Sequence, residues 1–428
     1  MSTSVDFRTR RHCDRVALDR DAIFDTLIPE ALEKNGALAG RGVAYKKLPA
    51  LSLQVEDRRL DLAVENERLV LSESPPAHRA LASLDESALS DLVQDWSTTM
   101  GLAMKTRVKI VEGDFNEWIG WEPVFRALFD ARPVHEAGAI GFDQIDGSPL
   151  NIEQSFSIDD ANDRPDEIAH FLSQAGYLHI RNVFTEDEMA SVSADLDAAL
   201  ARARADDGAS WWAEDSKGNE QAVRILYFQE QSAALRTLLA DKRLQWLGSL
   251  TGDPFKSEKT GTHQQAEGLV KPLDIQTGLS DLPWHKDCGQ GGHSYLCNSL
   301  TVGISVTGAD SESGALGIVP GSHRANVQTA GKDESLDMPA LKLETRTGDL
   351  TIHCSDTLHR AHRPTKRPRK VVYTGFRLGL KPGDAVEEVS KEQVRAERAR
   401  LTNVQDRIAT AGAGAGKSEF VALEDADR

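Results

Sequence analysis

Residues 347–364 read TGDLTIHCSDTLHRAHRP, and three histidines lie in or just after a predicted strand of this stretch. Thr347-Gly348-Asp349 has the composition of a turn, Leu350–His353 that of a buried strand, and the segment 358–360 follows it. Of the 12 histidines in the chain, seven fall between His263 and His362. This clustering is the main indication of a functional site, and we work outward from it.

A second histidine motif, WHKD at residues 284–287, precedes this stretch in the chain. Residues two apart on an extended segment project from the same side, so His285 and Asp287 can reach one metal ion. Two histidines and one carboxylate form the facial triad that leaves three positions on Fe(II) open for a bidentate cosubstrate and dioxygen. We therefore predict His285, Asp287 and His359 as metal ligands. Whether His353 faces the metal or the core depends on the strand register.

An isolated HxD motif carries little information, but it stands here among five pieces in a fixed order. They are FLSQAGYLHIRNVFTEDEM (171–189), PWHKD (283–287), SGALGIVPGSH (313–323), the stretch at 347–364, and RPRKVVYTGF (367–376). Over roughly residues 166–380 the chain resembles the phytanoyl-CoA dioxygenase family of Fe(II)/2-oxoglutarate oxygenases. The resemblance implies an α+β protein with a double-stranded β-helix, or jelly roll, whose open end holds iron on His285, Asp287 and His359.

The resemblance also implies residues for the cosubstrate. The family places an arginine about eleven residues after the last histidine, where it pairs with the distal carboxylate of 2-oxoglutarate. Arg369, ten residues after His359, aligns with it; Arg367 and Lys370 are neighbours that could be mistaken for it. Lys271 stands where the family often has a basic or amide side chain near the cosubstrate, although a surface lysine is the simpler interpretation.

Three further patterns have structural alternatives. His323 lies in a tight turn and is expected to be structural. Cys288, Cys297 and Cys354 lie near two histidines and raise a zinc site as an alternative, although thiolate sites usually show closer cysteine pairs. The stretch AGAGAGKS at 411–418 matches a loose phosphate-binding loop, but a charged predicted helix precedes it instead of a buried strand, so we interpret it as a linker.

The order of predicted elements divides the chain into residues 1–150, an accessory α/β domain; 151–385, the oxygenase domain; and 386–428, a charged helix and a flexible tail. In the first part, 50–71 alternates like half-buried strands, Ser83-Leu-Asp-Glu86 reads as a capping box, and a strand over 107–111 and a helix over 118–129 follow. Residues 45–131 faintly resemble the sterol-carrier-protein type of lipid-binding domain.

The second part begins with a predicted helix over 166–175, a strand over 177–183 and a capping box at Thr185-Glu-Asp-Glu188 that opens a long helix. From about 220 to 380, short strand-like runs alternate with turn residues, which is typical of a double-sheet β architecture.

Composition limits the classes of function. Among 428 residues, 50 Lys+Arg and 67 Asp+Glu give a formal charge of −17, which disfavours a nucleic-acid or anionic-membrane binder. No apolar run approaches the ~20 residues that a membrane-spanning helix needs, and the four cysteines form no CxxC pair, which favours a reducing cytoplasm.

The sequence therefore predicts a dioxygenase that uses Fe(II), 2-oxoglutarate and O2 to hydroxylate an unactivated C–H bond of a small hydrophobic substrate of the fatty-acyl, terpenoid or sterol type, giving succinate and CO2. A homodimer is compatible with the sequence. Retention of Asp287 argues against halogenation, because related halogenases lose that carboxylate. Two alternatives stay open: a non-catalytic carrier of hydrophobic ligands, and a zinc hydrolase that uses the same three ligands.

Overall fold

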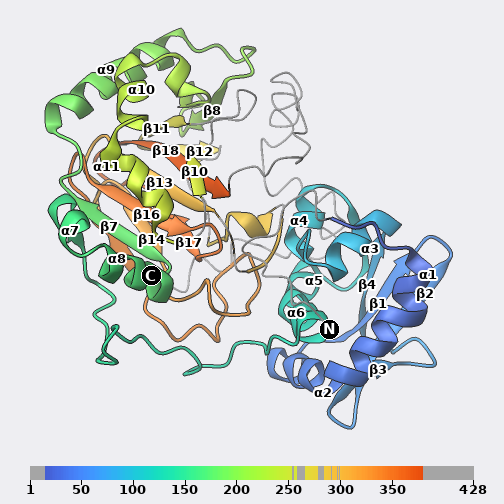
Figure 1. The fold of residues 1–428 in the computed structure, drawn as a ribbon. Helices are drawn as coiled ribbons and strands as arrows, with labels where there is room; N and C mark the ends of the chain where they lie inside the picture. Colours follow the sequence, from blue (N-terminus) through green and yellow to red (C-terminus); the bar gives the residue numbers. More distant parts are fainter. Residues whose placement is uncertain are drawn as a thin grey trace.

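A computed structural model describes residues 15–252, 255–257, 266–277, 284–290, 292–295, 297 and 299–378. The N-terminal unit lies on the right of Figure 1, and a larger β-rich part lies on the left. The coil that joins them runs along the lower edge of that view. Between Asp130 and Phe156 the chain forms no helix or strand, apart from an isolated bridge between Asp143 and Pro149. The predicted domain boundary falls in this coil, and the boundary itself stays a prediction.

The N-terminal unit is a five-stranded sheet covered by helices. Its strand order is β3-β2-β1-β4-β5; β1 and β4 are parallel and the other pairs are antiparallel. Trp118, Trp121 and Phe125 are fully buried between the helices and the sheet. The elements are α1 Arg20–Ala22, a π-helical turn Ile23–Leu27, α2 Ile28–Lys46, β1 Ala50–Val55, β2 Arg58–Glu65, β3 Arg68–Leu71, β4 Arg79–Leu84, α3 Glu86–Val93, α4 Thr99–Met104, β5 Val108–Glu112, α5 Phe115–Gly120 and α6 Glu122–Asp130.

Two details of the N-terminal prediction are wrong. Ser83 is not a helix cap, because it lies in β4 and pairs with Gln54 of β1. The cap of α3 is Asp85, whose carboxylate accepts the N–H of Ala88 at 2.6 Å. The single helix predicted over 118–129 is two helices, α5 and α6, that meet at Trp121. A proline in the first turn of α6 favours a helix start there, since proline lacks the N–H that a helix interior requires.

The β-rich part is the predicted jelly roll. Its large sheet has the order β12-β8-β9-β11-β18-β13-β16-β7-β6, with β10 also paired to β18, and a small sheet has the order β15-β14-β17. The strands are β6 Phe156–Ser157, β7 Tyr177–Arg181, β8 Ser210–Asp215, β9 Glu220–Ile225, β10 Phe255–Ser257, β11 Glu267–Lys271, β12 Ile275–Thr277, β13 Leu300–Ser305, β14 Leu316–Ile318, β15 Leu341–Leu343, β16 Leu350–Cys354, β17 His359–Ala361 and β18 Arg369–Leu378. The α+β, double-stranded β-helix class predicted from the sequence is confirmed.

Helices cover the outer side of the large sheet (Figure 1). The predicted capping box at Thr185 is present: the Thr185 hydroxyl accepts the N–H of Glu188, and the Glu188 carboxylate accepts the N–H of Thr185. The helices are α7 Ile158–Asp163, α8 Pro165–Ala175, α9 Glu186–Arg202, α10 Ala233–Leu239 and α11 Lys242–Gln245, with short 3-10 turns at Phe228–Glu230, Trp246–Ser249 and Cys288–Gln290. The C-terminal helix and tail predicted for 386–428 lie outside the described residues.

The two faces of the large sheet differ in chemistry. On the central strand β13, Leu300, Val302 and Ile304 join the apolar core that contacts the helices, and Thr301 and Ser305 point the other way. Residues that pair directly in antiparallel strands share a face. Thr301 pairs with His353 of β16, so His353 is on the inner, more polar face of the jelly roll.

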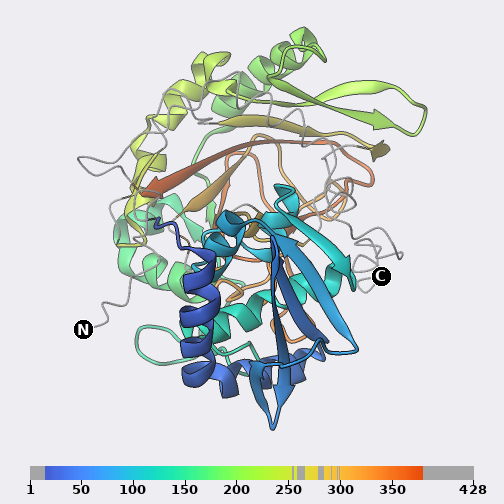
Figure 2. The ribbon, with the colours of Figure 1, turned by 90° about the vertical axis from the view of Figure 1, so that its right-hand side faces the viewer.

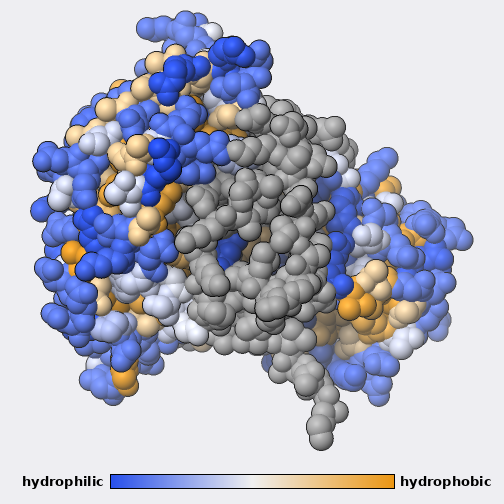
Figure 3. Space-filling view, turned by 45° about the horizontal axis from the view of Figure 1, so that its top comes forward, coloured by the Kyte–Doolittle hydropathy of each residue, from blue (hydrophilic) through white to orange (hydrophobic). Residues whose placement is uncertain are grey.

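The N-terminal unit packs on the segment that follows residue 284, and Figure 2 views the molecule from the side of this unit. The Ser294 N–H donates to the Asp95 carboxylate at 2.9 Å, and the Thr98 N–H donates to the Gly292 carbonyl at 2.9 Å. The Asn326 amide donates to the Pro123 carbonyl at 2.8 Å. The view in Figure 3 shows hydrophilic residues over most of the described surface and an apolar area on the N-terminal unit. Within the described residues, no helix has both the length and the apolar character needed to cross a bilayer.

The turn that precedes β16 gives a test of the fold. Gly348 has φ +86°, and a Cβ placed on it would overlap the carbonyl oxygen of Phe184. Gly138 has a similar φ of +82° with nothing within 4 Å. We expect Gly348→Ala to lower the free energy of unfolding by about 3 kcal/mol or more, and Gly138→Ala by only about 1 kcal/mol, the cost of a left-handed backbone alone. Urea unfolding measures both, and equal losses would contradict the steric explanation.

Candidate metal and cosubstrate site

Two histidines far apart in the sequence face each other across an isolated β-bridge. The N–H of His285 donates to the carbonyl of His359 at 2.9 Å, and the N–H of His359 donates back to the carbonyl of His285 at 3.0 Å. This reciprocal pair puts both side chains on one face, and their ring centroids are 4.2 Å apart. His359 begins β17, which β14 holds in the small sheet.

Asp287 completes a three-residue cluster. Its Oδ1 lies 3.3 Å from Nε2 of His285 and 3.5 Å from Nε2 of His359. Donor atoms at right angles on one metal ion are about 3 Å apart, since the bonds are about 2.1 Å long. The histidine side chains are 6% and 7% exposed, whereas that of Asp287 is 35% exposed. Solvent therefore reaches the cluster from the carboxylate side.

The second oxygen of Asp287 is held by the inner face of the large sheet. The Thr301 hydroxyl donates to Oδ2 at 2.9 Å, and Nε2 of His353 lies 3.5 Å from the same atom. The carboxylate thus points Oδ1 towards His285 and His359, while Oδ2 faces the inner side of the large sheet. Thr301 was not predicted, because a threonine in a strand carries no signal until its cross-strand partner is known.

The protonation of the cluster suits a cation. The carbonyl of Thr357 can only accept, so its 2.9 Å contact with Nδ1 of His359 places the ring proton there and leaves Nε2 as a lone-pair donor. Burial acts to raise the pKa of Asp287, but the interactions of its carboxylate with His359, His285 and His353 outweigh it. The pKa of Asp287 therefore lies well below its usual range, and the side chain is a carboxylate.

His353, which the sequence left undecided, belongs to this site. Its ring centroid is 4.1 Å from that of His359, and its side chain is 2% exposed. Neither ring nitrogen has a hydrogen-bond partner among the described residues. Its Nε2 lies beside Oδ2 of Asp287, on the inner face of the large sheet. His323 is elsewhere: its Nε2 lies 3.0 Å from the carbonyl of Ser173, and burial lowers its pKa to about 3.

Arg369 is buried at the start of β18. It is 5% exposed, and its Nε and Nη2 have no hydrogen-bond partner among the described residues. Side chains alternate between the two faces along β18, so Arg369 is on the same face as Tyr373 and Gly375. Gly375 in turn pairs with Thr301. A buried guanidinium with open donors is costly unless an anion fills the gap. Arg369 therefore lies on the same sheet face as Thr301, the residue that contacts Asp287.

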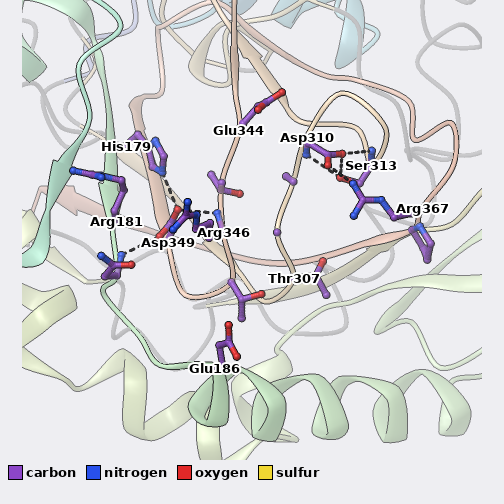
Figure 4. A pocket seen from close by; sticks show the side chains of 16 residues that line it. His179, Arg181, Glu186, Thr307, Asp310, Ser313, Glu344, Arg346, Asp349 and Arg367 are labelled. Carbon is purple, nitrogen blue, oxygen red and sulfur yellow. Dashed lines mark hydrogen bonds and ion pairs between the residues drawn. The ribbon is translucent and has the colours of Figure 1, made fainter.

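The two basic residues nearest to Arg369 in the sequence form ion pairs with acidic side chains. The Arg367 side chain is 59% exposed and pairs with Asp310, and Lys370 pairs with Asp197 of α9 at 2.6 Å. The ion pair of Arg367 borders a polar cleft of about 720 Å³ near the turn before β16 (Figure 4). In that view, His179 and Asp349 face each other across the hydrogen bond between them. The three residues of the cluster are not among those that line this cleft.

Lys271 is not the surface lysine that the simpler interpretation required. It is 0% exposed, pairs with Arg369 in the register of β11 and β18, and donates through Nζ to the carbonyl of His362 at 2.6 Å. Direct pairing places its side chain on the same sheet face as that of Arg369. Its predicted role near the cosubstrate stays a prediction.

Part of this chain, including the three residues of the cluster, matches a known protein family. Residues 172–371 match the model described as "Phytanoyl-CoA dioxygenase (PhyH)". Residues 172–371 form a phytanoyl-CoA dioxygenase family domain. The domain is that of a non-haem Fe(II)- and 2-oxoglutarate-dependent dioxygenase, with Fe(II) as its metal and 2-oxoglutarate and O2 as cosubstrates. The family predicted from the ordered motifs is confirmed. The comparison with curated proteins gave no match.

Solved structures of low identity are similar in part. The epimerase SnoN from nogalamycin biosynthesis is 20% identical, with a TM-score of 0.41, over 53% of this chain and 93% of its own. EctD from S. alaskensis is 21% identical, with a TM-score of 0.42, over 51% of this chain and 79% of its own. The carbocyclase SnoK is 20% identical, with a TM-score of 0.40, over 56% of this chain and 97% of its own.

The residues present fit the groups that the dioxygenase domain uses. Two imidazoles and one carboxylate are the donor set of the Fe(II) facial triad, and their donor atoms lie within 4.8 Å of one another in this chain. The open donors of Arg369 fit a carboxylate, which accepts two parallel N–H bonds from a guanidinium.

The contact between Thr301 and Asp287 can be tested directly. We expect Thr301→Val, which keeps the shape but removes the hydroxyl, to weaken Fe(II) binding by roughly 10–100-fold, because the carboxylate loses the bond that orients it. Anaerobic titration with Fe(II) measures the affinity. Ser305→Ala is the matched control on the same strand face, since the Ser305 hydroxyl donates to Thr345 at 2.9 Å. An unchanged affinity in Thr301→Val would remove the orienting role.

Proposed function

We propose that this dioxygenase hydroxylates an unactivated C–H bond of a small hydrophobic molecule of the fatty-acyl, terpenoid or sterol type, releasing succinate and CO2. The observation that carries the proposal is the cluster of His285, Asp287 and His359 on one side of a β-bridge, with the buried, open-donor Arg369 on a connected strand face. We assign the first three residues as the iron ligands and Arg369 as the cosubstrate anchor.

Each residue has a defined task in this proposal. His285 and His359 supply lone pairs from the paired bridge positions, and Asp287 supplies Oδ1 while Thr301 restrains Oδ2. Arg369 binds the distal carboxylate of 2-oxoglutarate, and Lys271 lies beside it as a second positive group. When bound, Fe(II) with 2-oxoglutarate would activate O2, which is the oxidant for C–H cleavage. The protein's own contribution is to orient the cosubstrate and position the target carbon.

The substrate class rests on weaker support. The resemblance of residues 45–131 to sterol-carrier domains and the acyl substrate in the family's name both favour an apolar compound. Retention of Asp287 supports hydroxylation over halogenation. Stimulation of succinate formation by a panel of acyl-CoA thioesters, free fatty acids, terpenoids and sterols tests the class. The cytoplasmic location and the homodimer stay predictions.

The metal ligands can be tested by spectroscopy before any substrate is known. Under anaerobic conditions we expect a visible charge-transfer band when Fe(II) and 2-oxoglutarate are both added, because the chelate needs open positions on a triad-bound metal. His285→Ala and Asp287→Ala should lose both the band and succinate formation. The exposed His78 provides the control variant His78→Ala, which should keep both.

The alternatives give different results in the same experiment. A carrier of hydrophobic ligands would bind apolar compounds without the band or succinate formation. A zinc hydrolase would be active without oxygen and indifferent to 2-oxoglutarate. Bound iron without a band in the parent protein would overturn the proposed function.

The cosubstrate anchor is a separate prediction. We expect Arg369→Ala to raise the dissociation constant for 2-oxoglutarate by roughly 10–150-fold, since a charge-assisted hydrogen bond contributes about 1.5–3 kcal/mol. Arg367→Ala is the matched control, because Arg367 pairs with Asp310 at the surface. Titration of the charge-transfer band with 2-oxoglutarate measures both variants. If Arg367→Ala shows the larger effect, the anchor is Arg367.

A further inference from the structure

A second cluster of metal-binding side chains begins one residue after Asp287. Cys288, His293 and Cys297 follow the spacing C-x4-H-x3-C, and one ligand atom of each lies within 4.8 Å of the other two. We propose that Cys288, His293 and Cys297 bind a zinc ion that fixes the loop between Asp287 and β13. This site is distinct from the predicted iron site and does not depend on the proposed function.

The donor set selects the metal. Two thiolates and one imidazole are soft and borderline donors, which suit Zn²⁺ in a tetrahedral site, whereas the two imidazoles and carboxylate next to it suit Fe(II). Donors around a tetrahedral zinc are about 3.5–3.8 Å apart, so small side-chain rotations are enough to close the cluster. Three protein ligands leave one position for water or another oxygen. The sequence alone indicates Cys288, Cys297 and Cys354 as candidates for zinc, whereas His293 is identified only by its position in the fold.

Backbone contacts hold the loop on both sides of the cluster. The Cys288 N–H donates to the Ser355 carbonyl at 3.1 Å, and the Cys297 N–H donates to the Asp356 carboxylate at 3.0 Å. From the other side, the Ser294 N–H donates to Asp95 of the N-terminal unit at 2.9 Å. The two cysteines are therefore anchored to the end of β16, and the segment between them is anchored to the N-terminal unit. When the backbone already holds the ligands in place, metal binding costs less conformational entropy.

The experiment uses the full chain with a His359→Ala substitution, which weakens metal binding at the neighbouring cluster. Protein reduced and purified anaerobically is titrated with Co²⁺, a spectroscopic substitute for zinc, and zinc content is measured separately by mass spectrometry after zinc loading and desalting. We expect about one zinc per chain and the near-ultraviolet sulfur-to-cobalt charge-transfer absorption that only a thiolate site gives.

Variants identify the ligands. Cys297→Ser and His293→Ala should lose the absorption and most of the zinc, whereas His293→Cys should keep zinc because a thiolate replaces the imidazole. Cys354→Ser is the matched control: Cys354 is a nearby cysteine outside the cluster, and its substitution should leave zinc binding unchanged. Circular dichroism confirms that each variant is folded.

Three results would overturn the proposal. One is a folded, reduced parent protein without the sulfur-to-cobalt absorption. Another is absorption that survives in both Cys288→Ser and Cys297→Ser. The third is recovery of Cys288 and Cys297 as a disulfide from protein kept anaerobic throughout purification.

Discussion

The reciprocal hydrogen bonds between the backbones of His285 and His359 are the constraint on which the site depends. They join a loop that follows β12 to the first residue of β17, 74 positions later in the chain, at 2.9 and 3.0 Å. Because neighbouring residues on a strand point to opposite faces, a slip of one position would turn one imidazole away from the other. Backbone geometry therefore brings the two nitrogen donors to one side of the bridge.

The large sheet divides stability and chemistry between its two faces. Leu300, Val302 and Ile304 bury one face of β13 against the helices, and this apolar core stabilises the fold. The opposite face carries Thr301, which restrains Asp287, and the paired strands add His353 and Arg369. A buried guanidinium with open donors is unfavourable on its own. The helix-covered face supplies the stability that lets the inner face hold such a group ready for an anion.

Much of this could be predicted from the sequence, and the failures have physical causes. The order of motifs indicated the family, and the resemblance to that family implied the jelly roll. The alternation of short strand-like runs with turn residues indicated only a double-sheet β architecture, because it is a local pattern. The capping box predicted at Ser83 is wrong because strand pairing overrides the local capping signal. For Lys271 the sequence left a surface position open beside the role near the cosubstrate, because its burial depends on pairing with β18. His353, Thr301 and His293 needed tertiary information: each acquires its role only from a partner across a strand or a loop.

The N-terminal unit is tied to the loop beside the predicted iron site through one carboxylate. Asp95 accepts the N–H of Ser294 at 2.9 Å and lies 3.9 Å from the guanidinium of Arg126, which is fully buried and pairs with Asp130 at 2.9 Å. Removing one member of a buried ion pair strongly destabilises the fold, because it leaves an unpaired charge in the interior. The contact of Asp95 with the loop is therefore part of the core of the N-terminal unit. The hydrogen bond from Ser294 to Asp95 therefore holds the N-terminal unit against the loop that begins one residue after Asp287.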